Sequence, residues 1–238
     1  MKYIYLLIRI LTHPGALIKY LVGRDPTKFE LVEIETWMTR KEINIIEAGS
    51  YDGRETVQFA KFWPTAKIMA YEPVPELYNN IVNTVAGYKN IQIQNKALSD
   101  HNGITKIISF SIDENSHGSS SILEPELQST LNSKIDFKRV FEVECVTLEE
   151  SYIKSKFDLV DVLWLDVQGM ELRVLMASRD ILKKIILCHI EISRVPLYKN
   201  SNSFNEINNF MINHNFSLIK VKAPINSGNA IYKNKSFI

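Results

Sequence analysis

The sequence has almost no net charge and few cysteines. Its 28 Lys and Arg residues nearly balance 27 Asp and Glu residues, so the formal net charge is +1 and no global field attracts nucleic acid. Cys145 and Cys188 lie far apart and outside any C-x-x-C pair, which argues against a zinc site and favours buried, reduced thiols. We therefore expect a cytoplasmic protein in a reducing compartment, with no nucleic-acid partner.

The sequence also has no long apolar run at its N-terminus. Residues Tyr3 to Leu11 are almost entirely apolar but are broken by Arg9, and a membrane span takes about 20 residues. A cleaved signal peptide is a weaker alternative, because Lys2 is the only charge before the run. We expect two short helices joined at Pro14-Gly15. They cover one edge of the core, or they dock peripherally on a membrane or an integral partner, and they could pair two subunits.

The rest of the chain alternates strand and helix patterns without repeats or a linker. We expect an N-terminal helical extension over 1–40 and one α/β domain over 41–238. The predicted fold is a Rossmann-like, doubly wound, mostly parallel sheet with an antiparallel C-terminal edge hairpin. The expected strands are 43–48, 67–71, 91–95, 104–110, 142–148, 160–167, 184–192, 216–221 and 229–232, and the expected helices are 27–40, 54–62, 76–85, 148–153, 171–177 and 203–213.

A glycine turn follows the first predicted strand. The turn reads Glu47-Ala48-Gly49-Ser50-Tyr51-Asp52-Gly53, and about 20 residues later the second strand ends at Glu72. An acid at that position can accept both hydroxyls of a ribose. The phosphate cradle G-x-G-x-x-G is absent, because Tyr51 stands where a glycine is needed. The pattern therefore predicts an unphosphorylated nucleoside ligand, of which S-adenosylmethionine is the common one.

Two other functions stay open at this point. A nicotinamide-dependent oxidoreductase would use a similar strand, turn and acid, although Tyr51 and the missing third glycine weaken that interpretation. A non-catalytic module that keeps the fold as a scaffold is the other.

Acidic residues mark the ends of four predicted strands: Glu47, Glu72, Asp166 and Glu191. Ligands of open α/β sheets bind beyond the carboxyl ends of the strands, so we expect these acids to converge there. Each acid alone could instead cap a neighbouring helix. The residues predicted to bind the cofactor are Glu47, Gly49, Ser50, Tyr51, Asp52, Gly53, Glu72, Pro73, Lys96, Ala97 and Asp166.

An ordered set of motifs resembles the FkbM-type S-adenosylmethionine-dependent methyltransferases. Its parts are Glu47 to Gly53, Tyr71-Glu72-Pro73, Asn95 to Gly103, Ser119 to Ser121 with Val146 to Glu149, Leu165 to Glu171, and Ile190-Glu191. Glu47 replaces the usual Asp, Gln168 the usual Glu, and Trp164 a common Lys. The resemblance covers about residues 43–193. It implies a class I methyltransferase-like fold and O-methylation of a glycan or a small metabolite.

Methyl transfer to a neutral hydroxyl requires a base. Asp166 is the first candidate because it ends a strand beside the expected methyl position, and Glu191 and His189 are alternatives. His117 could touch substrate, and Glu171 could orient Asp166. We assign no metal site, although Asp166 and Glu191 could share a divalent cation.

Overall fold

A computed structural model describes residues 26–111, 119–124, 137–193, 197–222 and 227–237. The two helices expected before residue 25 and the substrate contact expected of His117 lie outside these ranges, and both stay predictions. Within the ranges, no helix combines the length and the apolar character needed to cross a bilayer.

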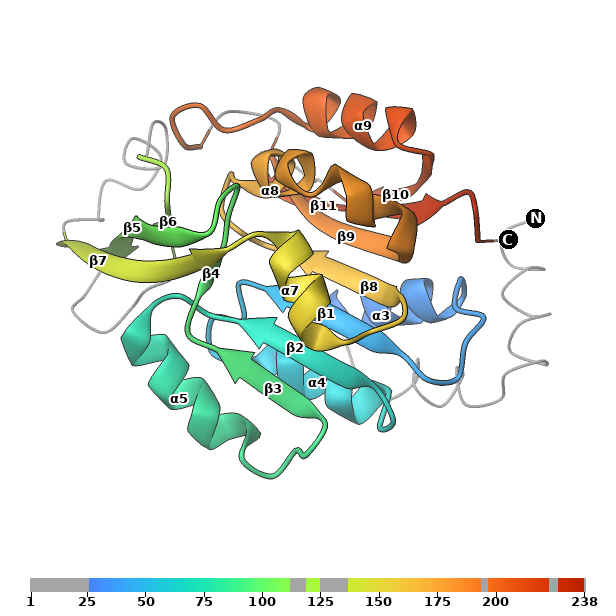
Figure 1. The fold of residues 1–238 in the computed structure, drawn as a ribbon, viewed down its shortest axis with the longest axis horizontal. Coiled ribbons are helices and arrows are strands. Elements are labelled where there is room, and N and C mark those ends of the chain that lie inside the picture. The colour runs from blue at the N-terminus through green and yellow to red at the C-terminus, as the bar shows by residue number, and fades with distance from the viewer. Residues whose placement is uncertain (1–25, 112–118, 125–136, 194–196, 223–226, 238) are drawn as a thin grey trace.

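The core of the fold is a seven-stranded sheet in the order β10-β11-β9-β8-β1-β2-β3 (Figure 1). Every pairing is parallel except those of β11, which runs antiparallel to β9 and β10. The predicted doubly wound sheet with an antiparallel edge hairpin is confirmed. The strands are β1 (Asn44–Ala48), β2 (Lys67–Tyr71), β3 (Ile91–Gln94), β8 (Val160–Leu165), β9 (Ile185–Ser193), β10 (Phe216–Lys222) and β11 (Ser227–Asn234).

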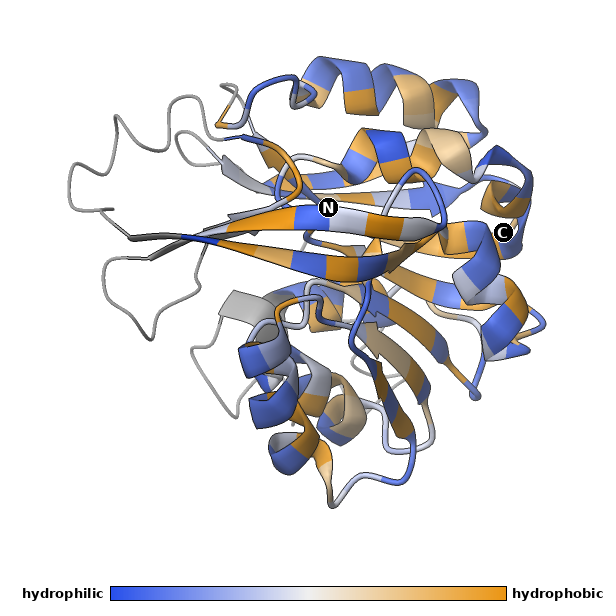
Figure 2. Cartoon of the chain, turned by 60° about the vertical axis from the view of Figure 1, so that its left-hand side comes forward, coloured by the Kyte–Doolittle hydropathy of each residue, from blue (hydrophilic) through white to orange (hydrophobic). Residues whose placement is uncertain are grey.

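Helices cover both faces of this sheet. One face carries α3 (Pro26–Glu35) and α4 (Arg54–Phe62), and α5 (Pro75–Val85) packs beside α4 and β3. The other face carries α7 (Leu148–Ser155), α8 (Glu171–Ala177), the 3-10 helix η1 (Arg179–Lys184) and α9 (Phe204–Asn213). All residues of β1 and β8 are buried, as expected of central parallel strands covered on both faces. Figure 2 shows hydrophobic residues along the strands and mixed residues on the helices.

Local signals in the sequence set several helix ends. Thr147 begins α7 by accepting a hydrogen bond from the Glu150 backbone N–H. Ser203 and Glu206 form a reciprocal capping box at the start of α9. The helix expected over 27–40 is wrong at its C-terminal end. It ends at Glu35, and the chain turns at Thr36 and Trp37.

The insertion between β3 and α7 forms a second, four-stranded sheet in the order β4-β7-β5-β6. Its strands are β4 (Ala97–Leu98), β5 (Gly103–Ser111), β6 (Ser119–Ser121) and β7 (Phe137–Val146). The sequence predicted β5 and part of β7, but not β4, β6 or a separate sheet. Because β6 consists of three serines, it has no apolar pattern, and its pairing with β5 defines it.

Candidate active site

The register of the central strands lines up the functional residues. Ala48 of β1 pairs with Tyr71 of β2 and with Leu165 of β8, which in turn pairs with Ile190 of β9. The next residue on each strand therefore lies at the same edge of the sheet: Gly49, Glu72, Asp166 and Glu191. This is the edge at which an open α/β sheet binds its ligand.

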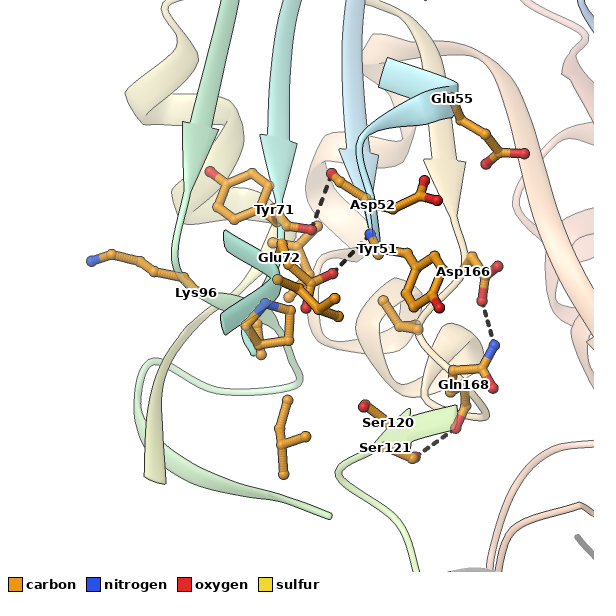
Figure 3. Close-up of a pocket in the computed structure, with 18 of the residues that line it drawn as sticks. Tyr51, Asp52, Glu55, Tyr71, Glu72, Lys96, Ser120, Ser121, Asp166 and Gln168 are labelled. Carbon is orange, nitrogen blue, oxygen red and sulfur yellow. Dashed lines mark hydrogen bonds between the residues drawn. The ribbon is translucent and has the colours of Figure 1, made fainter. Parts of the chain in front are cut away.

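The glycine turn brings β1 into direct contact with β8. Gly49 has a φ of 90°, and a Cβ at this residue would lie 1.9 Å from the backbone carbonyl oxygen of Asp166. No side chain fits there, so only glycine allows the two strand ends to approach this closely. Tyr51 also has a positive φ, of 49°, and its side chain is 40% exposed. A left-handed backbone conformation is costly for a bulky residue. The Tyr51 ring projects between Glu72 and Asp166 (Figure 3).

Glu72 is held rigidly at the end of β2. Its Oε2 accepts a hydrogen bond from the Tyr51 backbone N–H at 2.8 Å, and its Oε1 accepts one from the Val74 backbone N–H at 2.9 Å. Asn95 fixes the following turn by donating to the carbonyl oxygens of Glu72 and Pro73. Burial, and then the charge of Asp166, raise the pKa of Glu72 to about 7. A carboxylate has about four lone-pair positions, so two remain for a ligand.

The turn after β8 gathers three further polar side chains. The Gln168 Nε2 donates to Asp166 Oδ1 at 2.6 Å and to Glu191 Oε2 at 2.8 Å. Glu171 accepts from the backbone N–H groups of Val167 and Gly169. Burial raises the pKa of Glu171 to about 7. Burial, together with the charges of Asp166 and Glu171, raises the pKa of Glu191 well above its ordinary range.

Glu72, Asp166 and Gln168 line a cavity of about 400 Å³, the strand-end cavity (Figure 3). Two predicted cofactor residues, Glu47 and Gly53, are absent from its lining. The other nine line it: Gly49, Ser50, Tyr51, Asp52, Glu72, Pro73, Lys96, Ala97 and Asp166. Their roles toward a cofactor stay predictions. Sequence reasoning missed the part of the wall that comes from α4, α5 and the second sheet, which includes Gln58, Leu77, Ile107, Ser120 and Ile122.

The wall of the strand-end cavity is acidic. Asp52, Glu55, Glu72 and Asp166 contribute carboxylates to it. The two cations of the lining have partners: Arg54 pairs with Asp52, and Lys96 pairs with Glu144. The Lys96 ammonium also points away from the cavity (Figure 3). The arrangement suits a ligand that carries positive charge.

Glu47 lies inside the protein rather than at the cavity. Its side chain is completely buried, and its Oε2 accepts a hydrogen bond from the Thr56 hydroxyl at 2.7 Å. Its Oε1 has no hydrogen-bond partner within the described part of the chain. Burial raises the pKa of Glu47 to about 8, so the group is mostly protonated at neutral pH. A direct contact with a ligand ammonium, one of the roles expected of this acid, therefore has no support from its position.

Glu47→Gln is expected to stabilise the protein at high pH. A carboxyl whose pKa is raised on folding contributes most to the free energy of unfolding below its unfolded pKa of 4.5. This contribution is lost as the pH rises through the folded pKa of about 8. Glutamine does not titrate and can still accept from Thr56. At pH 8 the variant should unfold with a free energy higher by on the order of 2–3 kcal/mol, and at pH 5 the difference should be much smaller. Urea titrations at the two pH values measure this, and equal stability at pH 8 would contradict it.

His189 also lies away from the cavity. Its ring stacks on Trp164 with a centroid distance of 3.4 Å, and its Nε2 lies 3.0 Å from a carboxylate oxygen of Glu30 on α3. It shares a face of the sheet with Glu191, because side chains two positions apart on a strand point to the same side, but it is 2% exposed and lies deeper in the core. The position does not support the suggestion that His189 is the base.

The described residues contain no group of three or more His, Cys, Asp or Glu side chains arranged to hold a metal ion. Asp166 and Glu191 are instead bridged by the Gln168 amide. A cation shared by these two acids has no support from this arrangement.

The sheet order and the cavity define a class I methyltransferase fold. The chain resembles the crystal structure of the METTL16 methyltransferase domain, with a TM-score of 0.51 and 8% identity over 89% of this chain and 69% of that one. It also resembles a fibrillarin/Nop5p complex, with a TM-score of 0.53 and 12% identity over 89% of this chain and 81% of that one. At these identities the likeness concerns the fold.

The family follows from the sequence. The model of the methyltransferase FkbM domain matches residues 47–218, and the chain belongs to this family. A curated relative, the 2-O-methyltransferase NoeI of Sinorhizobium fredii, is 24% identical over 181 residues, which cover 74% of each chain. The predicted family is confirmed, and its cofactor is S-adenosylmethionine.

The residues present fit this cofactor. Glu72 keeps two lone-pair positions for the two ribose hydroxyls, and its pKa of about 7 leaves much of it ionised at neutral pH. The acidic wall suits a sulfonium. A cavity of about 400 Å³ lies within the range of small-molecule sites.

Proposed function

We propose that this protein transfers the methyl group of S-adenosylmethionine to a hydroxyl of a glycan or of a small metabolite. The observation that carries the proposal is the fixed carboxylate of Glu72 at the strand-end cavity. The two backbone hydrogen bonds use one lone pair on each oxygen and already fix this carboxylate in place. Its contacts with the protein therefore give no reason for it to line a cavity as well. The named activity of the relative NoeI supports a hydroxyl as the acceptor.

The chain contributes binding, orientation and a base. When bound, S-adenosylmethionine supplies a methyl group on a sulfonium sulfur, which leaves as a neutral thioether. Glu72 accepts the ribose hydroxyls, and the backbone of Lys96 and Ala97 borders the space expected for the adenine. Asp166 takes the proton that the acceptor hydroxyl loses, because its carboxylate lines the cavity and Glu191 does not.

The acceptor enters past the second sheet in this proposal. Ser120 and Ser121 form the part of the wall beyond Asp166 and Gln168 (Figure 3), and Ile122, which follows them in the chain, also lines the cavity. The Ser120 hydroxyl next to an apolar side chain suits a sugar, which has polar edges and apolar ring faces.

S-Adenosylhomocysteine should raise the melting temperature of the purified protein. A ligand at about 100 times its Kd adds about 2.7 kcal/mol, which corresponds to roughly 5–10 °C for a chain of this size. NAD at the same concentration is the control and should give no shift. Absence of a shift at saturating S-adenosylhomocysteine rejects the proposal, and a shift with NAD alone would favour the oxidoreductase.

The acceptor class needs a second measurement. Transfer of a radiolabelled methyl group should be detected with oligosaccharides that carry free 2-hydroxyls, and not with the same compounds already methylated there. If cofactor binds but no acceptor in a broad panel is labelled, the scaffold interpretation is favoured instead.

A further inference from the structure

Gln168 is hydrogen-bonded through both polar atoms of its side chain. Its side chain lines the strand-end cavity beside Asp166. Each polar atom of its side chain contacts a named partner: Nε2 contacts Asp166 and Glu191, and Oε1 accepts from the Tyr198 hydroxyl at 2.6 Å. A glutamine with all these positions used is fixed in one orientation.

The orientation of the amide follows from its partners. A carboxylate only accepts hydrogen bonds, so the NH₂ group must face Asp166, and the Tyr198 hydroxyl can then donate to the amide oxygen. The reversed amide would place its oxygen against a carboxylate. Tyr198 is 2% exposed, so its hydroxyl is held in place by the surrounding core.

The backbone at Gln168 is strained and specifically held. Gln168 has a φ of 52° and Gly169 a φ of 98°, so two consecutive residues are left-handed. The Ser121 hydroxyl of β6 donates to the Gln168 carbonyl oxygen at 2.6 Å, and Glu171 accepts from the Gly169 N–H. Such strain is retained where the surrounding structure requires one geometry.

Several acidic side chains surround Asp166, and their charges make the orientation of its carboxylate depend on a hydrogen-bond donor. Asp166 is near Glu72 from β2, Glu191 from β9 and Glu171 from α8, and Glu55 of α4 adds to the same field. Repulsion from these groups would favour turning the Asp166 carboxylate out of line or protonating it. A neutral amide that donates to both Asp166 and Glu191 opposes both effects without adding charge.

We propose that Gln168 is a positioning residue: its amide, oriented by the Tyr198 hydroxyl, donates to both Asp166 and Glu191 and aims the Asp166 carboxylate into the strand-end cavity. The catalytic meaning of this arrangement rests on the proposed function, in which Asp166 is the base. The arrangement itself concerns only residues of this chain.

The test follows the titration of Asp166 by ¹³C NMR in the protein without ligand. In Gln168→Glu and Gln168→Ala, Asp166 loses its donor, and its titration midpoint should rise by at least about one pH unit relative to the unmodified protein. Tyr198→Phe removes one oxygen and frees the amide, so a smaller rise in the same direction is expected. Gln92→Glu, the same change at an exposed position of β3, should leave the midpoint unchanged.

A structural role alone would give a different result. If the variants only lower the melting temperature while the Asp166 midpoint stays within about 0.2 pH units in all of them, the proposal is overturned. Tyr198→Phe keeps the test decisive should the Gln168 variants fail to fold. A shifted midpoint in a protein that S-adenosylhomocysteine does not stabilise would support the positioning role and reject the methyltransferase function. An unchanged midpoint in a protein that S-adenosylhomocysteine does stabilise would reject the positioning role and support the methyltransferase function.

Discussion

Glu72→Ala should abolish the stabilisation by S-adenosylhomocysteine. The alanine removes the acceptor for both ribose hydroxyls, and hydrogen bonds to a charged group contribute about 1.5–3 kcal/mol each. Two such bonds correspond to a loss of affinity of roughly 100-fold or more. Isothermal titration calorimetry with S-adenosylhomocysteine measures the change directly.

The pH dependence of binding gives an independent check of Glu72. Its pKa in the free protein is about 7, and hydroxyl donors bind the ionised form better. Binding therefore releases a proton near neutrality, and the Kd should increase up to ten-fold per pH unit as the pH falls below 7. In Glu72→Gln this dependence should disappear.

Controls must separate binding from folding in this experiment. Glu72→Ala also leaves the backbone N–H groups of Tyr51 and Val74 without their acceptor, so thermal unfolding of the free variant should be recorded. Asp180→Ala removes an exposed acid on η1 and should bind like the unmodified protein. If Glu72→Ala is folded and binds with unchanged affinity, the carboxylate does not hold the ribose.

Asp166→Asn should lower kcat by about 10²–10⁴-fold, the contribution typical of a positioned general base. Asparagine has nearly the same shape, and its Oδ1 can still accept from Gln168. The affinity for S-adenosylhomocysteine should change much less than kcat. Initial rates of methyl transfer to the oligosaccharide found in the acceptor panel measure the effect.

The matched control for this variant is Asp158→Asn. Asp158 is exposed just before β8 begins, at the end of the strand opposite Asp166, and pairs with Arg40. Its variant should turn over within about two-fold of the unmodified protein. A kcat for Asp166→Asn within three-fold of the control would mean that another group, or solvent, takes the proton.

The sequence predicted those parts of the site that depend on local spacing. A glycine after β1 and an acid after β2 follow from the chain order and from the parallel register, and both lie at the strand-end cavity. The alternation along β9 placed His189 and Glu191 on one face but carried no information about depth. The burial of His189 depends on Trp164 and on Glu30, which is 159 positions away in the chain.

Contacts between distant segments could not be predicted in the same way. Gln168 depends on Tyr198, thirty positions later, and on Ser121, forty-seven positions earlier. The strand β6 that carries Ser121 has no apolar period to reveal it. The burial of Glu47 could not be predicted either, because it is set by helix packing around Thr56 rather than by its place at a strand end.

The backbone contact between Gly49 and Asp166 limits how this enzyme could be redesigned. There is no room for even a methyl group at this contact, so the turn after β1 and the turn after β8 are packed rigidly against each other. Substitutions in one turn would therefore displace the other. The opposite wall is built by an insertion whose side chains can change separately. A library for new acceptor selectivity is therefore best placed at Ile107, Ser120 and Ile122, with Ser121 kept as it is.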